Sequence, residues 1–119
     1  MRPDSGDDGL AHLDAEDHKL ITLARAARGR IGAAEGAAVR DGDGRSYAAP
    51  SVRLPSVSVS ALQLAVANAV AAGAEALEAA VVVTEGRPDE VSLAAVRDVS
   101  SDAPVHVVAS DGALKKTLP

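Results

Sequence analysis

The sequence predicts a layered α/β domain with a mixed sheet, and three observations support this class. Helical patterns alternate with apolar strand patterns along the chain, as in layered α/β folds. The length of 119 residues is typical of one domain. The apolar residues, 47% of the chain, include no Cys, Trp or Phe, so the core must be built from Ala, Val and Leu.

The first predicted helix begins near Asp14 and ends at Gly29. Apolar residues recur along it at helical spacing, acidic residues occupy its first turn, and Arg25 and Arg28 lie in its last turn. This distribution of charge suits the helix dipole. Residues 1–12 are expected to form a disordered acidic tail, which leaves 13–119 as a single domain.

A β-hairpin is predicted after this helix, from two short segments over 36–40 and 45–48. The Asp-Gly-Asp-Gly sequence between them also resembles the opening of a calcium loop. Arg45 and Val52, however, occupy positions where that loop needs oxygen ligands. A hairpin turn is therefore favoured. The Pro- and Ser-rich stretch over 50–59 is expected to be an ordered loop, with a brief strand over 57–60 as the alternative.

The second half of the chain alternates helices with strands. Ser60 is a suitable N-cap for a helix over 61–72, and that helix is apolar almost all round, so we expect it to be buried on most sides. The remaining predicted elements are a buried strand over 79–84, a helix ending near Val99, a strand over 105–109 and an edge strand over 113–118.

Composition excludes several functional classes. The absence of Cys excludes disulfide scaffolds, thiolate metal sites and Cys nucleophiles. Tyr47 is the single aromatic residue and the net charge is −5, which together argue against a nucleic-acid partner. No apolar run is long enough to span a membrane and the N-terminus lacks an apolar signal region, so a cytoplasmic protein without membrane contact is expected.

Five segments together resemble a known family. Residues 59–70, Val-Ser-Ala-Leu-Gln-Leu-Ala-Val-Ala-Asn-Ala-Val, are similar to the helix that begins Cys-Ala-Glu in small zinc-dependent cytidine deaminases. Segments 20–28, 36–47, 91–98 and 102–112 look like that family's first helix, hairpin, Pro-Cys-Gly-x-Cys-Arg helix and closing strand, in the same order. The resemblance implies a three-layer α/β/α, cytidine-deaminase-like fold with a mixed sheet of about five strands. It also implies a homo-oligomer, either a dimer or a tetramer.

The chemistry of that family is missing at the matching positions. Cytosine deamination needs a zinc-bound water, held by Cys and His ligands, and a Glu that moves the proton. In this register Ser60 occupies the first zinc-ligand position and Leu62 the Glu position, while Leu93 and Val96 replace the two remaining Cys. We therefore expect no catalytic residue, no metal and no cofactor. Leu62, Leu93 and Val96 are expected to meet as an apolar plug.

Two functions are consistent with these losses. The first is a non-catalytic cytidine-deaminase-like protein with a structural, assembly or regulatory role, acting with copies of itself or with a protein partner that the sequence does not identify. The alternative is a small-molecule sensor, or an enzyme of different chemistry, that uses a residual polar pocket of Arg97, Asp98 and His106 near Ser60. The first function predicts no cavity at the positions that match the family's zinc site, whereas the second predicts a cavity lined by these polar groups.

Overall fold

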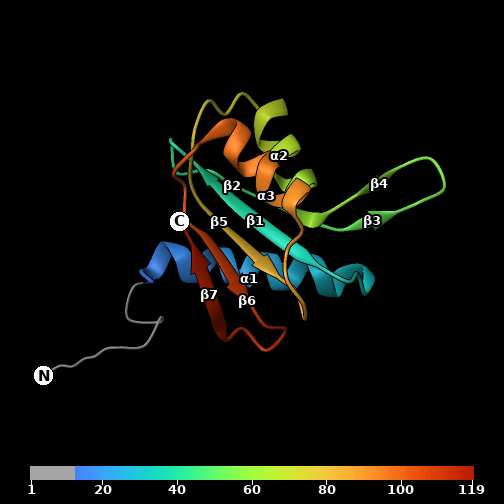
Figure 1. Cartoon of the computed structure of the whole chain (residues 1–119). Coiled ribbons are helices and arrows are strands. Elements are labelled where there is room, and N and C mark those ends of the chain that lie inside the picture. The colour runs from blue at the N-terminus through green and yellow to red at the C-terminus, as the bar shows by residue number, and fades with distance from the viewer. Residues whose placement is uncertain (1–12) are drawn as a thin grey trace, which may run out of the picture.

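The computed structural model describes residues 13–119 (Figure 1). The predicted tail over 1–12 lies outside these residues. The described elements are α1 (Ala15–Ile31), β1 (Gly36–Asp41), β2 (Ser46–Pro50), β3 (Val52–Arg53), β4 (Ser58–Val59), α2 (Ala61–Ala71), β5 (Leu77–Val83), α3 (Glu90–Val99), β6 (Val105–Val108) and β7 (Leu114–Leu118). Apart from β3 and β4, they follow the predicted order. None of the helices in this part of the chain is long and apolar enough to cross a membrane.

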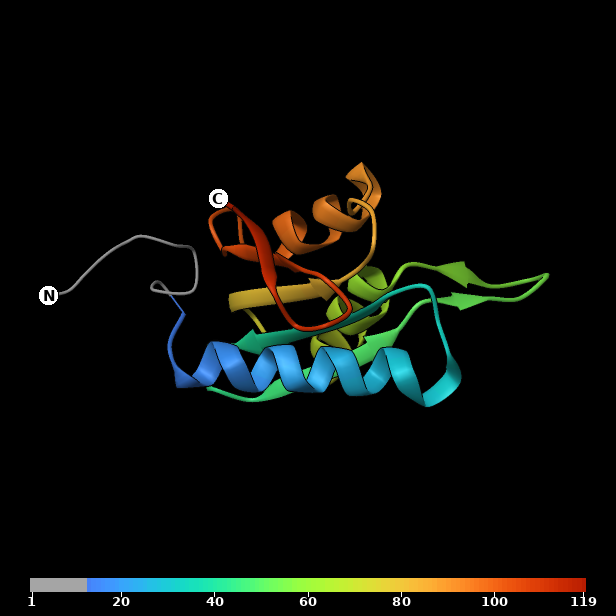
Figure 2. The ribbon, with the colours of Figure 1, turned by 90° about the horizontal axis from the view of Figure 1, so that it is seen from below.

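A five-stranded mixed sheet forms the middle layer, in the order β2-β1-β5-β6-β7. The central strands β5 and β6 are parallel, and the other neighbouring pairs are antiparallel. Helix α1 covers one face of the sheet, whereas α2 and α3 cover the other (Figure 2). The predicted three-layer α/β/α fold with a mixed sheet of about five strands is therefore confirmed.

Strand β5 divides the core into two halves, because its side chains alternate between the faces of the sheet. Val81 and Val83 pack beneath α1 with Leu20 and Ala24. Val82 packs instead in the cluster beneath α2 and α3. A strand that is buried on both faces needs a continuous apolar sequence, which explains the uninterrupted Ala and Val run in the middle of β5.

Helix α1 ends later than predicted, so the prediction of an end at Gly29 is wrong. The helix continues to Ile31, and Gly32 adopts the left-handed conformation, with φ of 64°, that closes many helices. Its start agrees with the sequence pattern. Asp14 is the N-cap, and its carboxylate accepts a hydrogen bond of 2.9 Å from the Asp17 backbone N–H.

The stretch over 50–59 is a narrow two-stranded ribbon rather than a loop. Strands β3 and β4 pair antiparallel, and Leu54 and Val57 hydrogen-bond to each other across the turn. The brief strand predicted over 57–60 corresponds in part to β4. The ribbon projects from the body of the molecule (Figure 1), and both Leu54 and Val57 are exposed near its tip.

Helix α2 is buried along one side only. Leu62, Ala65 and Ala69 face the core, whereas Ala67 and Val70 are exposed. The expectation that this helix is buried on most sides therefore does not hold within one chain.

Candidate functional site

The N-terminal ends of α2 and α3 meet at a buried pair of hydroxyl groups. Ser60 caps α2 through a capping box: its Oγ accepts from Gln63 N at 3.1 Å, and Gln63 Oε1 accepts from Ser60 N at 2.9 Å. Ser92 lies in the first turn of α3. The Oγ atoms of Ser60 and Ser92 are only 2.6 Å apart, and both residues are at least 97% buried.

Asp89 joins this pair from the N-cap position of α3. Its carboxylate accepts a hydrogen bond of 3.0 Å from Ser92 N. Hydrogen bonds from the Ser92 hydroxyl and backbone hold the pKa of Asp89 below its ordinary value. Because a hydroxyl carries one hydrogen, Ser92 donates either to Ser60 or to Asp89, and in the second case Ser60 donates to Ser92. Either arrangement links the starts of the two helices.

Apolar side chains lie behind this pair. Leu62 and Val96 are fully buried in the core cluster under α2 and α3, and Leu93 is partly buried against the same cluster. All three residues predicted to form an apolar plug thus belong to, or pack on, one apolar cluster. Leu93 also borders a surface cavity on its other side.

The residues predicted to form a residual polar pocket lie apart. Arg97 lies near the end of α3 and donates hydrogen bonds to the backbone oxygens of Ala103 and Pro119, which tie the helix to the segment after β7. Asp98 is exposed. His106 is buried on the opposite face of the sheet, because Val105 and Val107 on either side of it face α2 and α3. The structure does not bring Arg97 and His106 together.

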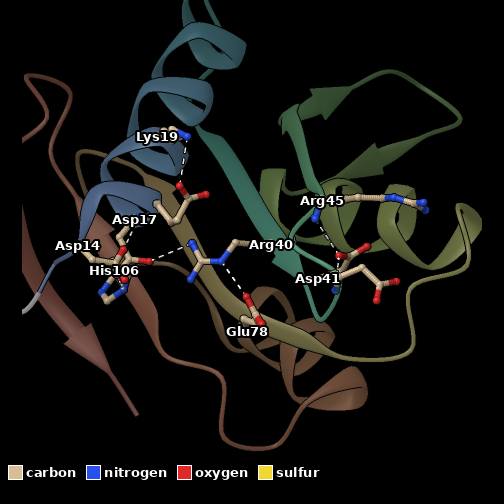
Figure 3. Close-up of polar contacts among 10 residues, drawn as sticks. Asp14, Asp17, Lys19, Arg40, Asp41, Arg45, Glu78 and His106 are labelled. Carbon is tan, nitrogen blue, oxygen red and sulfur yellow. Dashed lines mark hydrogen bonds and ion pairs between the residues drawn. The ribbon is translucent and has the colours of Figure 1, made fainter.

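His106 belongs instead to a charged cluster beneath α1 (Figure 3). Arg40 bonds Asp17 at 3.2 Å and Glu78 at 3.0 Å. His106 Nδ1 is 2.9 Å from Thr117 Oγ1, and its Nε2 is 3.8 Å from Asp17 Oδ2. Burial lowers the pKa of His106, although Asp17 acts in the opposite direction.

The cavities on the surface of residues 13–119 include two that matter for the site. The larger, of about 440 Å³, lies between the loop after β5, the start of α3, β6 and β7. The smaller, of about 200 Å³, lies beside the Asp41–Asp43 turn. Neither of these two cavities is lined by Ser60, Ser92 or Leu62. Asp41 Oδ1 accepts from Asp43 N and Arg45 N, so its carboxylate serves the hairpin turn that the sequence favoured over a calcium loop.

Comparison with known proteins decides the family. A family model described as cytidine deaminase-like matches residues 13–112. The chain belongs to the cytidine deaminase-like family. Comparison with curated protein sequences finds none that matches.

Two solved structures support the same fold. Cytidine deaminase from Burkholderia pseudomallei is 24% identical, with a TM-score of 0.75 over 85% of this chain and 90% of that protein. Cytidine deaminase from Mycobacterium leprae is 18% identical, with a TM-score of 0.66 over 86% of this chain and 93% of that protein. These likenesses concern the fold.

The groups present at this cytidine deaminase-like site do not fit the zinc ion that the family resemblance implies. Zinc binds ligand oxygens at about 2.0 Å, and in a tetrahedral site two such oxygens lie about 3.3 Å apart. The Ser60 and Ser92 oxygens, at 2.6 Å, bond each other instead. Leu62, Leu93 and Val96 supply no ligand atom, and the chain contains no Cys. Among residues 13–119, no three His, Asp or Glu side chains are grouped to hold a metal.

Sequence reasoning missed two features of this cytidine deaminase-like chain. It placed Leu93 at the first Cys position of α3, whereas Ser92 is the residue that touches Ser60. The spacing of Asp89 and Ser92 indicates only that Ser92 lies in the first turn of α3, and it carries no signal for the contact with Ser60. It also missed the Asp17–Arg40 ion pair. A charged residue inside the otherwise apolar strand over 36–40 indicates a buried partner.

Proposed function

We propose that this chain is a non-catalytic cytidine deaminase-like protein, a single domain over 13–119 that acts as a structural or assembly module. The observation that carries the proposal is the direct contact between Ser60 and Ser92 at the meeting point of two helix starts. One neutral hydroxyl donates a hydrogen bond to the other there. The arrangement therefore needs no metal charge to hold the helix starts together.

The residues around the pair give further support. A deaminase needs a carboxylate that moves protons beside the attacking water, and Leu62 has no titratable group. Leu62 and Val96 are fully buried. Each such side chain contributes about 1.5–3 kcal/mol by burial, so apolar packing can stabilise this region without an ion.

The outer side of α2 supports assembly as the role. No charged residue occurs between 61 and 72, and Val70 on the exposed side is 50% accessible. Gln63 and Asn68 are the two polar residues of α2, and a helix that is apolar almost all round is usually enclosed on most sides. A second copy of the chain packed on α2 would enclose it, so a homo-oligomer is part of the proposal.

The sensor alternative has less support. It requires Ser60, Arg97, Asp98 and His106 around one remodelled pocket. Arg97 and His106 belong to opposite sides of the sheet, and Arg97 is engaged with backbone carbonyls.

The proposal is tested by zinc analysis and a deamination assay on the purified full chain. We expect substoichiometric zinc, no turnover of cytidine, and a melting temperature that a chelator leaves unchanged. The deaminase from Burkholderia pseudomallei, assayed alongside, serves as the positive control. Stoichiometric zinc or cytidine turnover in this chain would show that the proposal is wrong.

A further inference from the structure

The cavity of about 440 Å³ lies at the carboxyl end of the parallel pair β5 and β6. Open α/β sheets commonly bind ligands at this edge. The volume falls within the range of about 300–1,000 Å³ that is usual for small-molecule sites. The cavity is separate from the Ser60–Ser92 contact. Its lining residues are Gly86, Arg87, Pro88, Leu93, Val107, Lys115, Lys116 and Leu118.

The lining combines an apolar part with positive charge. Leu93, Val107 and Leu118 supply apolar surface, while Arg87, Lys115 and Lys116 supply three cationic groups. The lining is thus locally positive, although the chain as a whole carries a net charge of −5. The acidic neighbours in the sequence, Glu85 and Asp89, do not line the cavity. Glu85 accepts from Ser110 N, and Asp89 caps α3.

Lys115 is held in place at the wall of the cavity. Its Nζ donates to the carbonyl oxygens of Thr84 at 2.8 Å and Gly86 at 3.0 Å, just beyond the end of β5. A lysine ammonium has three donors, and these are the two bonds it makes among the described residues. One N–H remains for a ligand, on a group that has already lost much of its conformational freedom. Such preorganisation favours binding.

We propose that this cavity binds a small organic anion, with an apolar body against Leu93, Val107 and Leu118 and a phosphate or carboxylate group against Arg87, Lys115 and Lys116. Arg and Lys recognise both anionic groups through charge-assisted hydrogen bonds. The proposal does not depend on whether the chain deaminates cytidine or assembles with itself.

Calorimetric titration of the full chain with four probes tests the ligand class. Phenyl phosphate and benzoate each combine an apolar body with an anion, and the tighter of them identifies the anionic group. Inorganic phosphate carries only charge, and benzyl alcohol is the neutral control. We expect at least one aromatic anion to bind about tenfold more tightly than either control. The proposal is overturned if neither aromatic anion binds saturably or if a control binds as tightly.

Variants then assign the site. Arg87→Gln and Lys116→Gln are both at exposed positions, so neither should disturb folding. Each should weaken binding of the aromatic anion by about threefold to tenfold. Lys19→Gln removes the same charge from an exposed position on α1, away from the cavity, and should leave the affinity unchanged. If both cavity variants bind the anion as tightly as the unmodified chain, the anion binds elsewhere. The same conclusion follows if Lys19→Gln weakens binding as much as the cavity variants do.

Discussion

His106 is a buried base between an acid and an arginine. Asp17 attracts the protonated ring, whereas burial and the nearby Arg40 disfavour it, and burial is the largest effect. The pKa of His106 therefore lies below its ordinary value of 6.5. Asp14, the N-cap of α1, also favours the protonated ring, and Thr117 on β7 bonds its Nδ1.

The stability of the fold should consequently fall in mild acid. The folded chain holds the His106 proton less tightly than the unfolded chain, so protonation favours unfolding. The contribution of neutral His106 to the free energy of unfolding is complete above pH 6.5, and it is lost as the pH falls from 6.5 through the lowered pKa. Urea unfolding between about pH 7.5 and about pH 5.5 measures it in a range where ordinary carboxylates stay charged.

Two variants separate His106 from other groups. His106→Gln cannot titrate and should show a smaller loss of unfolding free energy over this pH range. His18→Gln, at an exposed position on α1, serves as the matched control. An unchanged pH dependence in His106→Gln would contradict the assignment.

Ser60 has two structural roles, as the cap of α2 and as the partner of Ser92. Ser60→Ala should lower the free energy of unfolding by about 1–2 kcal/mol, because it removes a helix cap and leaves a buried hydroxyl without its partner. Chemical denaturation measures the change. Ser56→Ala, in the exposed turn of the ribbon, should change stability by less than about 0.5 kcal/mol. If Ser60→Ala lowers the free energy of unfolding no more than Ser56→Ala does, the Ser60–Ser92 pair adds little to stability.

Single side chains mark where sequence reasoning stops. Ser60 could be identified as a cap because capping depends on local spacing. The choice between Ser92 and Leu93 could not be made locally, because neighbouring helical residues point about 100° apart and only the packing of α3 on α2 fixes the rotation. His106 and Arg97 were predicted to share a pocket from their chemistry alone, and strand alternation separates them.

Element order was predictable, while element ends depended on contacts. The alternation of helices with apolar strands predicted a layered α/β domain with a mixed sheet, and the family resemblance implied the three layers. Gly29 follows Arg28 and Gly32 comes two residues after Arg30, so basic residues precede both glycines at which α1 could end. Gly29 has open space around it and stays helical, whereas Gly32 takes the left-handed conformation. Strand β3 was missed, and β4 was predicted only as an alternative to a loop, because each strand has only two residues.

The crossing of α1 over β1 depends on Gly36. A Cβ at this position would lie 2.1 Å from the Ala24 carbonyl oxygen and 2.8 Å from Arg28 Cβ. Gly36→Ala should therefore destabilise the chain by about 3 kcal/mol, since helix and strand would have to separate. Thermal or urea unfolding measures the loss.

Gly29→Ala is the matched control for this crossing. It adds the same methyl group inside α1, where nothing lies within 4 Å of the added Cβ. Because alanine favours helix over glycine, this variant should gain about 0.5–1 kcal/mol. The two variants should change the free energy of unfolding in opposite directions. Equal changes would contradict a close approach of α1 to β1 at Gly36.

The chain as a whole leaves exposed apolar side chains on two different layers. Val70 lies on the outer side of α2 and Ile31 at the end of α1, with exposures of 50% and 61%. Scattered apolar residues are normal on protein surfaces, so exposure alone does not identify an interface. Val70 differs because its helix carries no charged residue, whereas α1 is rich in charge. Charged residues are depleted at the centres of interfaces, which favours α2 as the surface for the proposed self-association.

Light scattering coupled to size-exclusion chromatography tests this assignment. The chain has a mass of 11.9 kDa, and assembly through α2 predicts a multiple of that value. Val70→Glu should shift the mass toward that of one chain, because a carboxylate buried between copies is strongly unfavourable. Ile31→Glu places the same charge at a more exposed apolar position on the opposite layer and should leave the assembly intact. A monomeric wild-type chain, or equal dissociation by both variants, would contradict assembly through α2.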